Sequence, residues 1–323
     1  MTLSSSLVIP TYNRPQELAV ALASILRQTR LPEQLVIIDD GQLEDIPQRA
    51  ALEAAGVEIL YQRKSIPDLP TSRNIGIRIS SGDVVLFLDD DVELEPDYIA
   101  QMLAPLEADP DGRIAGVGGR ILNFRKLRPA HRLRRLFDRL FLVSGGIEGR
   151  VLPSGFTTNY GSTFNPSTRP YRVDVISGGV AAWRRWVFEE FHFSENYRVH
   201  CAGEDQDFSY QVSRRYPLLF NPRARLSHFE APSMRHDRYH SARRFLFDRY
   251  RFFRTHVQRW PLQGMLFWWA VTGYTLSRLM VLLLRPDSAE RSRVRGILSA
   301  IHDILRGRLP WKTAEIKPSA GLE

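Results

Sequence analysis

The sequence is poor in cysteine and lysine, and it has no long uninterrupted hydrophobic run. Cys201 is the only cysteine in 323 residues, so the chain cannot form an internal disulfide or a zinc site built from cysteines. The residues before Leu7 contain no basic and apolar segments of the kind that form a signal peptide. We therefore expect a cytoplasmic protein. A hydrophobic content of 43% is enough to build a core and excludes a disordered chain.

Charge is distributed unequally along the chain. Residues 1–120 contain 10 basic and 19 acidic residues, whereas residues 121–323 contain 34 basic and 17 acidic residues. This asymmetry indicates a cation-using site joined to a region that meets anions, such as phosphates or the head groups of an anionic membrane surface. Nucleic acid is another anion, but we expect no nucleic-acid partner because the sequence contains no recognised nucleic-acid-binding module.

Short apolar runs alternate with segments of helical spacing in the first third of the chain. The runs cover residues 7–10, 35–38, 57–61 and 84–88, and helices are expected to begin near Asn13, Pro70 and Pro96. Continuous apolar runs are typical of parallel strands that are covered on both faces. The pattern predicts an α/β fold with a Rossmann-like, mostly parallel sheet and flanking helices. Further along, we expect a strand over residues 173–176 and a helix over residues 183–190.

Acidic residues directly follow two of these predicted strands, as Asp39-Asp40 and as Asp89-Asp90-Asp91. In an open α/β sheet, ligands bind beyond the carboxyl ends of the strands. Three adjacent carboxylates repel one another unless a cation lies among them, and Mg²⁺ or Mn²⁺ with oxygen ligands is the natural partner. The alternative is a solvated acidic turn that caps the helix near Pro96.

Five short motifs occur in an order that is known from one enzyme family. They are Val8-Ile9-Pro10-Thr11-Tyr12-Asn13, Asp39-Asp40-Gly41, Arg73-Asn74-Ile75-Gly76, Asp89-Asp90-Asp91 and Gly203-Glu204-Asp205. In these motifs the chain resembles the family 2 glycosyltransferases of the GT-A fold, from about residue 7 to about residue 230. The resemblance implies an inverting enzyme that transfers a sugar from a nucleotide diphosphate to an acceptor hydroxyl, using Mg²⁺ or Mn²⁺.

The resemblance also implies roles for individual residues. It assigns donor binding to Pro10, Tyr12, Asp40, Arg73, Asp89 and Asp90. It assigns metal binding to Asp89, Asp91 and His228. Asp205 is implied as the general base, and Glu204 would orient the acceptor or the base. Gly178, Gly179 and Trp183 are expected in the acceptor and sugar pocket. Trp186 is a second aromatic that could stack on a sugar, although core packing is expected for at least one of the two tryptophans. His236 and His240 are the rivals of His228 for the metal.

Two other functions remain open from the sequence. One is a nucleotidyltransferase that forms nucleotide sugars, although no glycine-rich pyrophosphate loop follows the first predicted strand. The other is a catalytically silent nucleotide- or sugar-binding module, which the presence of both Asp91 and Asp205 disfavours.

The remaining segments are basic and aromatic. We expect a catalytic domain over residues 1–235, with a nucleotide-sugar half (1–120) and an acceptor half (121–235), and a helical extension over residues 236–323. A basic amphipathic helix over residues 133–141 is left open between packing on the core, acceptor capture and membrane contact. Residues 265–284 are long enough to cross a bilayer, but Arg278 favours an interfacial hairpin. We expect a peripheral enzyme at the inner membrane face with a glycan or lipid-linked glycan acceptor, and oligomerisation stays open.

Overall fold

The structure is a computed structural model that describes residues 2–123, 131–158, 167–195, 203–229 and 237–313. The chain divides into two compact units. The first unit is formed by Met1–Leu152 and Phe156–Met234, and the second by Pro153–Gly155 and Arg235–Glu323.

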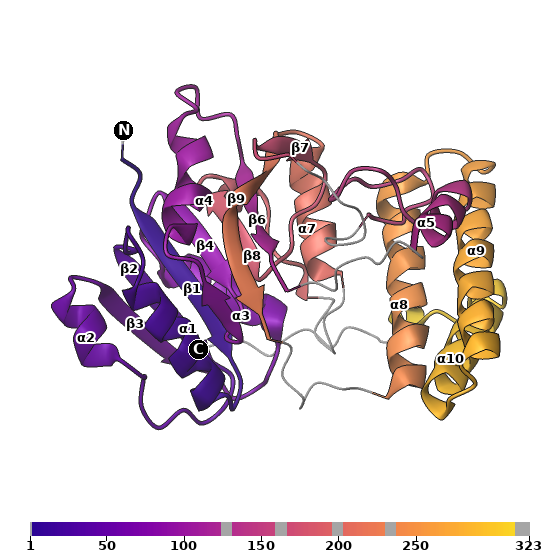
Figure 1. Ribbon diagram of the computed structural model, residues 1–323, viewed down its shortest axis with the longest axis horizontal. Helices are drawn as coiled ribbons and strands as arrows, with labels where there is room; N and C mark the ends of the chain where they lie inside the picture. Colours follow the sequence, from indigo (N-terminus) through magenta and orange to yellow (C-terminus); the bar gives the residue numbers. More distant parts are fainter. Residues whose placement is uncertain (1, 124–130, 159–166, 196–202, 230–236, 314–323) are drawn as a thin grey trace. The chain divides into compact units, whose positions relative to one another are not determined.

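The first unit is built on one mixed sheet with the strand order β3-β2-β1-β4-β8-β6-β9-β5, and β7 pairs with β9 (Figure 1). The strands are β1 Ser5–Thr11, β2 Gln34–Asp39, β3 Glu58–Arg63, β4 Val84–Leu88, β5 Val92–Leu94, β6 Gly116–Ile121, β7 Tyr171–Val173, β8 Val180–Arg184 and β9 Leu218–His228. Strands β3, β2, β1 and β4 are parallel to one another, whereas β8 runs antiparallel to both β4 and β6. The predicted sheet and its first four strands are confirmed.

Helices cover both faces of this sheet. The helices of this unit are α1 Pro15–Leu26, α2 Arg49–Ala54, α3 Leu69–Ile79, α4 Tyr98–Glu107, α5 His131–Leu140, α6 Val187–Glu190 and α7 Glu204–Ser213, and α1 and α4 lie on the opposite face of the sheet from α3 and α7. Leu7 and Ile9 of β1 pack in one core cluster with α1 and α4, while Val8 packs on the opposite face with residues of α3 and α7. Side chains alternate between the faces of a strand, so the continuous apolar run of β1 supplies both clusters.

The sequence prediction fails around residue 183, where a helix over residues 183–190 was expected. Residues Val180–Arg184 instead form β8, and the helix that follows is only α6, Val187–Glu190. Strand β8 lies between β4 and β6, and both of these partners are far away in the sequence. Tertiary pairing therefore decides the conformation of this segment, which local periodicity cannot predict.

The amphipathic helix α5 exposes its apolar side. Leu133, Leu136 and Leu140 are 77%, 65% and 65% exposed. The helix therefore does not use these leucines to pack on the core.

The second unit is helical. It contains α8 Arg238–Phe252, which continues as a short π-helical turn Phe253–Val257, and then α9 Gln263–Leu284, α10 Ser288–Leu305 and α11 Pro310–Thr313. Helix α10 packs closely on α8, because a Cβ atom at Gly296 would lie 2.2 Å from the carbonyl oxygen of Tyr239. By length and composition α9 could cross a membrane, although 28% of its most apolar window is buried in the protein.

Candidate active site

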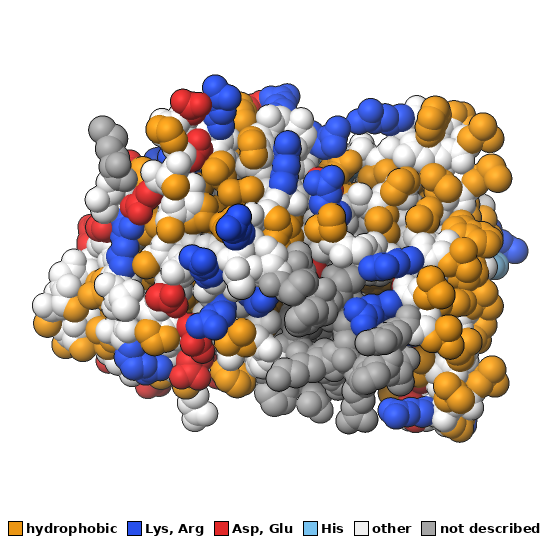
Figure 2. Space-filling model, turned by 45° about the horizontal axis from the view of Figure 1, so that its top comes forward, with side chains coloured by type: hydrophobic (Ala, Val, Ile, Leu, Met, Phe, Trp, Pro, Cys, Tyr) orange, Lys and Arg blue, Asp and Glu red, His pale blue; other side chains and the backbone are white. Residues whose placement is uncertain are grey.

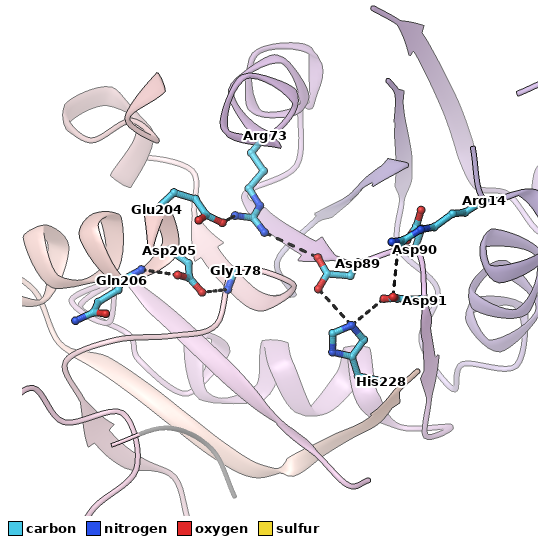
Figure 3. A network of polar contacts seen from close by, with 10 residues as sticks. All are labelled: Arg14, Arg73, Asp89, Asp90, Asp91, Gly178, Glu204, Asp205, Gln206 and His228. Carbon is cyan, nitrogen blue, oxygen red and sulfur yellow. Dashed lines mark hydrogen bonds and ion pairs between the residues drawn. The ribbon is translucent and has the colours of Figure 1, made fainter. Parts of the chain in front are cut away.

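The acidic triplet follows β4, whose five residues Val84–Leu88 are all buried. The chain then continues into β5, which pairs antiparallel with the end of β9, so that Val92 lies opposite His228. This pairing brings His228 next to the triplet: its Nε2 atom lies 2.8 Å from Oδ1 of Asp91 and 3.8 Å from Oδ2 of Asp89 (Figure 3). Long-range strand pairing therefore assembles the three residues that the sequence assigned to the metal.

Asp89, Asp91 and His228 can supply one ligand atom each, and these atoms lie within 4.8 Å of one another. Two carboxylate oxygens and one imidazole nitrogen form a donor set that suits Mn²⁺ or Mg²⁺. Burial raises the pKa of Asp89 above its ordinary value, and the charges of Arg73 and His228 oppose this effect. The geometry fits a divalent cation.

The middle carboxylate of the triplet points away from this cluster. Asp90 is 4% exposed, and it accepts hydrogen bonds from the Thr11 hydroxyl at 2.8 Å and from Nη1 of Arg14 at 2.9 Å. The same Nη1 atom lies 3.2 Å from Oδ2 of Asp91. The sequence assigned Asp90 to the donor, but its carboxylate is occupied inside the protein. Arg14 was not predicted, although it directly follows the Tyr12-Asn13 motif.

Arg73 lies between the triplet and helix α7. Its Nη1 atom donates to Oε1 of Glu204 at 2.8 Å, and its Nη2 atom lies 3.9 Å from Oδ1 of Asp89. Burial alone would lower the pKa of Arg73, but the carboxylates of Glu204, Asp89 and Asp205 hold it above the ordinary value. The sequence placed Arg73 against the base or diphosphate of the donor. The side chain is only 3% exposed, so the guanidinium is enclosed by its carboxylate partners.

Glu204 and Asp205 begin α7 and have different surroundings. Glu204 is buried, and this burial, together with the neighbouring charge of Asp205, raises its pKa although Arg73 opposes the shift. Oδ2 of Asp205 accepts a hydrogen bond from the Gly178 backbone at 3.1 Å, and Oδ1 accepts one from the Gln206 backbone at 2.7 Å. Glu204 is therefore tied to an arginine, whereas Asp205 is held by backbone amides.

The two glycines between β7 and β8 lie where a side chain would collide with the site. A Cβ atom at Gly178 would lie 2.6 Å from the guanidinium of Arg73. A Cβ atom at Gly179 would lie 2.0 Å from the Asp89 carboxylate. The glycine loop therefore runs between Asp89 and Asp205, as Figure 3 shows, and its backbone can approach a ligand closely.

The end of β1 and the end of β2 carry the other predicted donor residues. Pro10 is a β1 residue paired with Ile38, and Tyr12, just after the strand, is 51% exposed. Asp40 is 8% exposed, accepts hydrogen bonds from the Ser72 hydroxyl, and lies 3.1 Å from Nζ of Lys64.

Trp183 does not line the pocket that the sequence predicted for it. Its side chain is 2% exposed and makes an edge contact with Phe208 at a centroid distance of 4.9 Å. The indole is a core group of β8 and cannot stack on a sugar. Trp186 lines a cavity of about 500 Å³ near Tyr216, beside the first residues of β6 and β9 and thus at the opposite end of these strands from His228.

Of the two rival histidines, the structure describes His240, which makes an ion pair within the second unit. His240 pairs through Nδ1 with Asp237, three residues earlier, at 2.9 Å. His236 lies outside the described residues, as does Cys201.

The sequence pattern of glycosyl transferase family 2 matches residues 6–191, more than half of the chain. The chain belongs to this family. Its residues are 28% identical over 222 positions to a hyaluronan synthase of Pasteurella multocida, covering 65% of this chain and 22% of the relative. They are 27% identical over 221 positions to a chondroitin synthase of Escherichia coli, covering 65% of this chain and 32% of the relative. The family 2 chain thus spans a third or less of the length of these two relatives.

Two solved glycosyltransferases share the fold of this family 2 chain. The structure of GalNAc-T7 with UDP, GalNAc and Mn²⁺ superposes with a TM-score of 0.57 at 19% identity, covering 94% of this chain and 57% of the other. The mannosyltransferase PcManGT from Pyrobaculum calidifontis, in complex with GDP-Man and Mn²⁺, gives a TM-score of 0.56 at 14% identity, covering 97% and 89%. The fold is therefore the GT-A fold that the sequence predicted.

Proposed function

We propose that this family 2 protein is an inverting, metal-dependent glycosyltransferase that moves a sugar from a nucleotide diphosphate to an acceptor hydroxyl in surface polysaccharide or glycolipid assembly. The observation that carries the proposal is the pair of acidic groups on either side of the glycine loop. Asp89, Asp91 and His228 converge on one side, and Asp205 is held by the Gly178 amide on the other. Membership of the family favours this reaction over the nucleotidyltransferase and silent-module alternatives.

Donor binding is proposed at the carboxyl ends of β1, β2 and β4. Tyr12 is exposed enough to stack on the nucleotide base, with Asp40 as the polar partner of the base and Pro10 shaping the strand end. Asp89, Asp91 and His228 would hold Mg²⁺ or Mn²⁺. When bound, such a cation acts as a Lewis acid that neutralises the charge of the departing diphosphate.

Asp205 is proposed as the general base. A hydroxyl attacks poorly until its proton is removed, and a positioned carboxylate accepts that proton at neutral pH. The acceptor oxygen then forms a bond to the anomeric carbon as the bond from that carbon to the diphosphate breaks, so the configuration inverts. Arg73 and Glu204 would position this arrangement, because their ion pair joins α7 to the acidic triplet.

The two units are proposed to have separate tasks. Residues 1–235 would form the catalytic domain, with donor binding in 1–120 and acceptor binding in 121–235. Residues 236–323, in which basic residues outnumber acidic ones, would hold the enzyme at the cytoplasmic membrane face, near a glycan or lipid-linked glycan acceptor.

Substitution of the two neighbouring acids tests the proposal. Asp205→Asn should lower kcat by at least ~10²-fold and leave the Kd of the nucleotide sugar nearly unchanged, because a general base contributes about that much to the rate. Turnover is measured by release of nucleoside diphosphate, and donor binding by calorimetry with Mn²⁺ present.

Glu204→Gln is the matched control, since it changes the adjacent carboxylate without removing the proposed base. A loss of turnover that is much larger in Glu204→Gln than in Asp205→Asn would identify Glu204 as the base. Absence of transfer from every nucleotide sugar tried with the wild-type chain would contradict the proposed function itself.

A further inference from the structure

Helix α9 has two faces of different character. Its buried residues are Phe267, Ala270, Val271 and Gly273. Its exposed residues follow helical spacing on the other face, and they are Met265, Trp269, Thr272, Leu276, Leu279, Met280, Leu283 and Leu284. Figure 2 shows hydrophobic side chains gathered over this helical part of the chain.

The exposed face of α9 is almost entirely apolar. Met280, Leu283 and Leu284 are 56%, 83% and 77% exposed. Thr272 is the single polar residue of the face, and its hydroxyl donates to the Trp268 carbonyl at 2.9 Å, so that it presents no unsatisfied donor. A contiguous apolar patch of this kind marks an interaction site.

The only charged residue within α9 points to the protein side. Nη1 of Arg278 lies 3.5 Å from Oε1 of Glu290 on α10, and the guanidinium lies 5.6 Å from the ring centroid of Tyr274. Glu290 is 6% exposed and also pairs with Arg293. A helix that crossed a bilayer would carry these charges into the hydrocarbon region, whereas a helix that lies in the interface keeps them on the aqueous side.

The charges around α9 complement an anionic surface. From Phe252 to Pro286 the sequence contains no acidic residue and four arginines, of which only Arg278 belongs to α9 itself. Arg254 and Arg259 are exposed before the start of the helix, and Arg285 is exposed directly after its end. Arginines at both ends of an apolar face suit lipid head groups, and aromatic residues such as Trp269 suit the boundary below them.

We infer that α9 is a monotopic membrane-binding helix that lies flat in an anionic lipid surface, with the face from Met265 to Leu284 inserted. This inference names the lipid partner of the proposed enzyme and rests on that proposal for its cytoplasmic setting. At 1.5 Å per residue, the 22 residues of α9 extend about 33 Å along the surface. Two arginines of α8 make contacts within the protein instead: Arg243 pairs with Asp303, and the guanidinium of Arg251 lies 5.8 Å from the ring centroid of Trp311.

Flotation of the full chain with vesicles tests the inference. The wild-type protein should float with phosphatidylglycerol-containing vesicles at low salt and bind pure phosphatidylcholine vesicles at least tenfold less. The lipid-bound fraction should be at least tenfold smaller in the triple variant Leu276→Ser, Met280→Ser, Leu283→Ser than in the wild type. The matched control is Val20→Ser, Ile66→Ser, Ile147→Ser, which alters three exposed apolar residues of the other unit and should float like the wild type.

The depth of labelled α9 residues in the bilayer distinguishes a helix that lies flat from one that spans the membrane. Fluorescent labels at Met265→Cys, Leu276→Cys and Leu283→Cys, each in a Cys201→Ser background, should report the same shallow depth by lipid-borne quenchers. A label at position 276 that lies deeper than those at 265 and 283 would show a span and overturn the inference. Failure of the wild type to float, or equal flotation of the triple variant, would also overturn it.

Two further measurements, of sugar transfer and of the oligomeric state, distinguish lipid binding by α9 from other roles of its apolar face. The triple variant should transfer sugar to a soluble acceptor at the wild-type rate, and Asp205→Asn should float like the wild type. Lipid binding can therefore be measured even if the proposed enzyme activity is wrong. Light scattering gives the oligomeric state. A wild-type dimer that becomes a monomer in the triple variant, without lipid binding in either, would assign the face to a second copy of the chain and contradict the inference.

Discussion

Two acidic clusters lie at the ends of buried strands of the same sheet, but their carboxylates have different partners. At the end of β2, Asp39 accepts hydrogen bonds from the backbone of Gly41 and Leu43 and from the Tyr61 hydroxyl, all at 2.7–2.8 Å. After β4, Asp89 and Asp91 converge on one imidazole, and the basic groups around them are shared with other carboxylates. In the first cluster, protein groups satisfy the Asp39 carboxylate. In the second cluster, oxygen atoms of two carboxylates lie close to one imidazole nitrogen, as metal ligands do.

The difference shows that the sequence Asp-Asp does not by itself predict a ligand site. The Asp39 carboxylate is fully buried, and its donors come from the turn that it closes, at Gly41 and Leu43, and from the neighbouring strand β3, at Tyr61. Asp89 and His228 keep 33% and 25% of their side chains exposed, and they face each other across the end of the sheet. Partner type therefore distinguishes the structural acid from the metal-binding acids, whereas burial does not, because Asp91 is itself only 7% exposed.

The largest expected effect concerns Arg14, which contacts both Asp90 and Asp91. Arg14→Met should weaken Mn²⁺ binding by about 10- to 100-fold, the usual effect of removing a group that orients a metal ligand. Calorimetric titration with Mn²⁺ measures the affinity.

Arg27→Met is the control for Arg14→Met, because Arg27 pairs with Glu93 on the surface, where both side chains are about half exposed. Arg14→Lys should restore part of the affinity, since it restores the positive charge without the planar guanidinium. Equal Mn²⁺ affinity in Arg14→Met and the wild type would remove Arg14 from the metal site.

A smaller effect is expected at the first cluster. Asp39→Asn should lower the free energy of unfolding by about 1 kcal/mol, the typical net contribution of a hydrogen bond, without changing Mn²⁺ affinity. Thermal or urea unfolding measures the difference.

The effect of Asp39→Asn should also depend on pH. Burial alone would raise the pKa of Asp39, but hydrogen bonds from the Leu43 backbone, the Tyr61 hydroxyl and the Gly41 backbone hold it below its ordinary value of 3.8. The ionised Asp39 carboxylate therefore contributes fully to the free energy of unfolding at pH values above that ordinary pKa. This contribution disappears as the pH falls through the lower pKa of the folded state. A difference in stability that grows as the pH falls below 4 would contradict this assignment.

Much of the fold could be predicted from the sequence, because the first strands are continuous apolar runs followed by polar motifs. The antiparallel half could not, since Trp183 belongs to a strand whose partners β4 and β6 are distant in sequence. In the site, the histidine near Asp91 could be proposed from the family pattern alone. The enclosure of Arg73 and Asp90 could not, because it depends on how Glu204, Thr11 and Arg14 pack around them.

Binding of Mn²⁺ tests the central claim most directly, because the claim is that Asp89, Asp91 and His228 form one divalent cation site. The free Mn²⁺ signal in electron paramagnetic resonance should fall with a stoichiometry of one ion per chain, and a nucleoside diphosphate should tighten the binding. Asp91→Asn should lose this site while its far-ultraviolet circular dichroism stays that of the wild type. Unchanged Mn²⁺ binding in folded Asp91→Asn, or no binding by the wild type with the nucleotide present, would contradict the account.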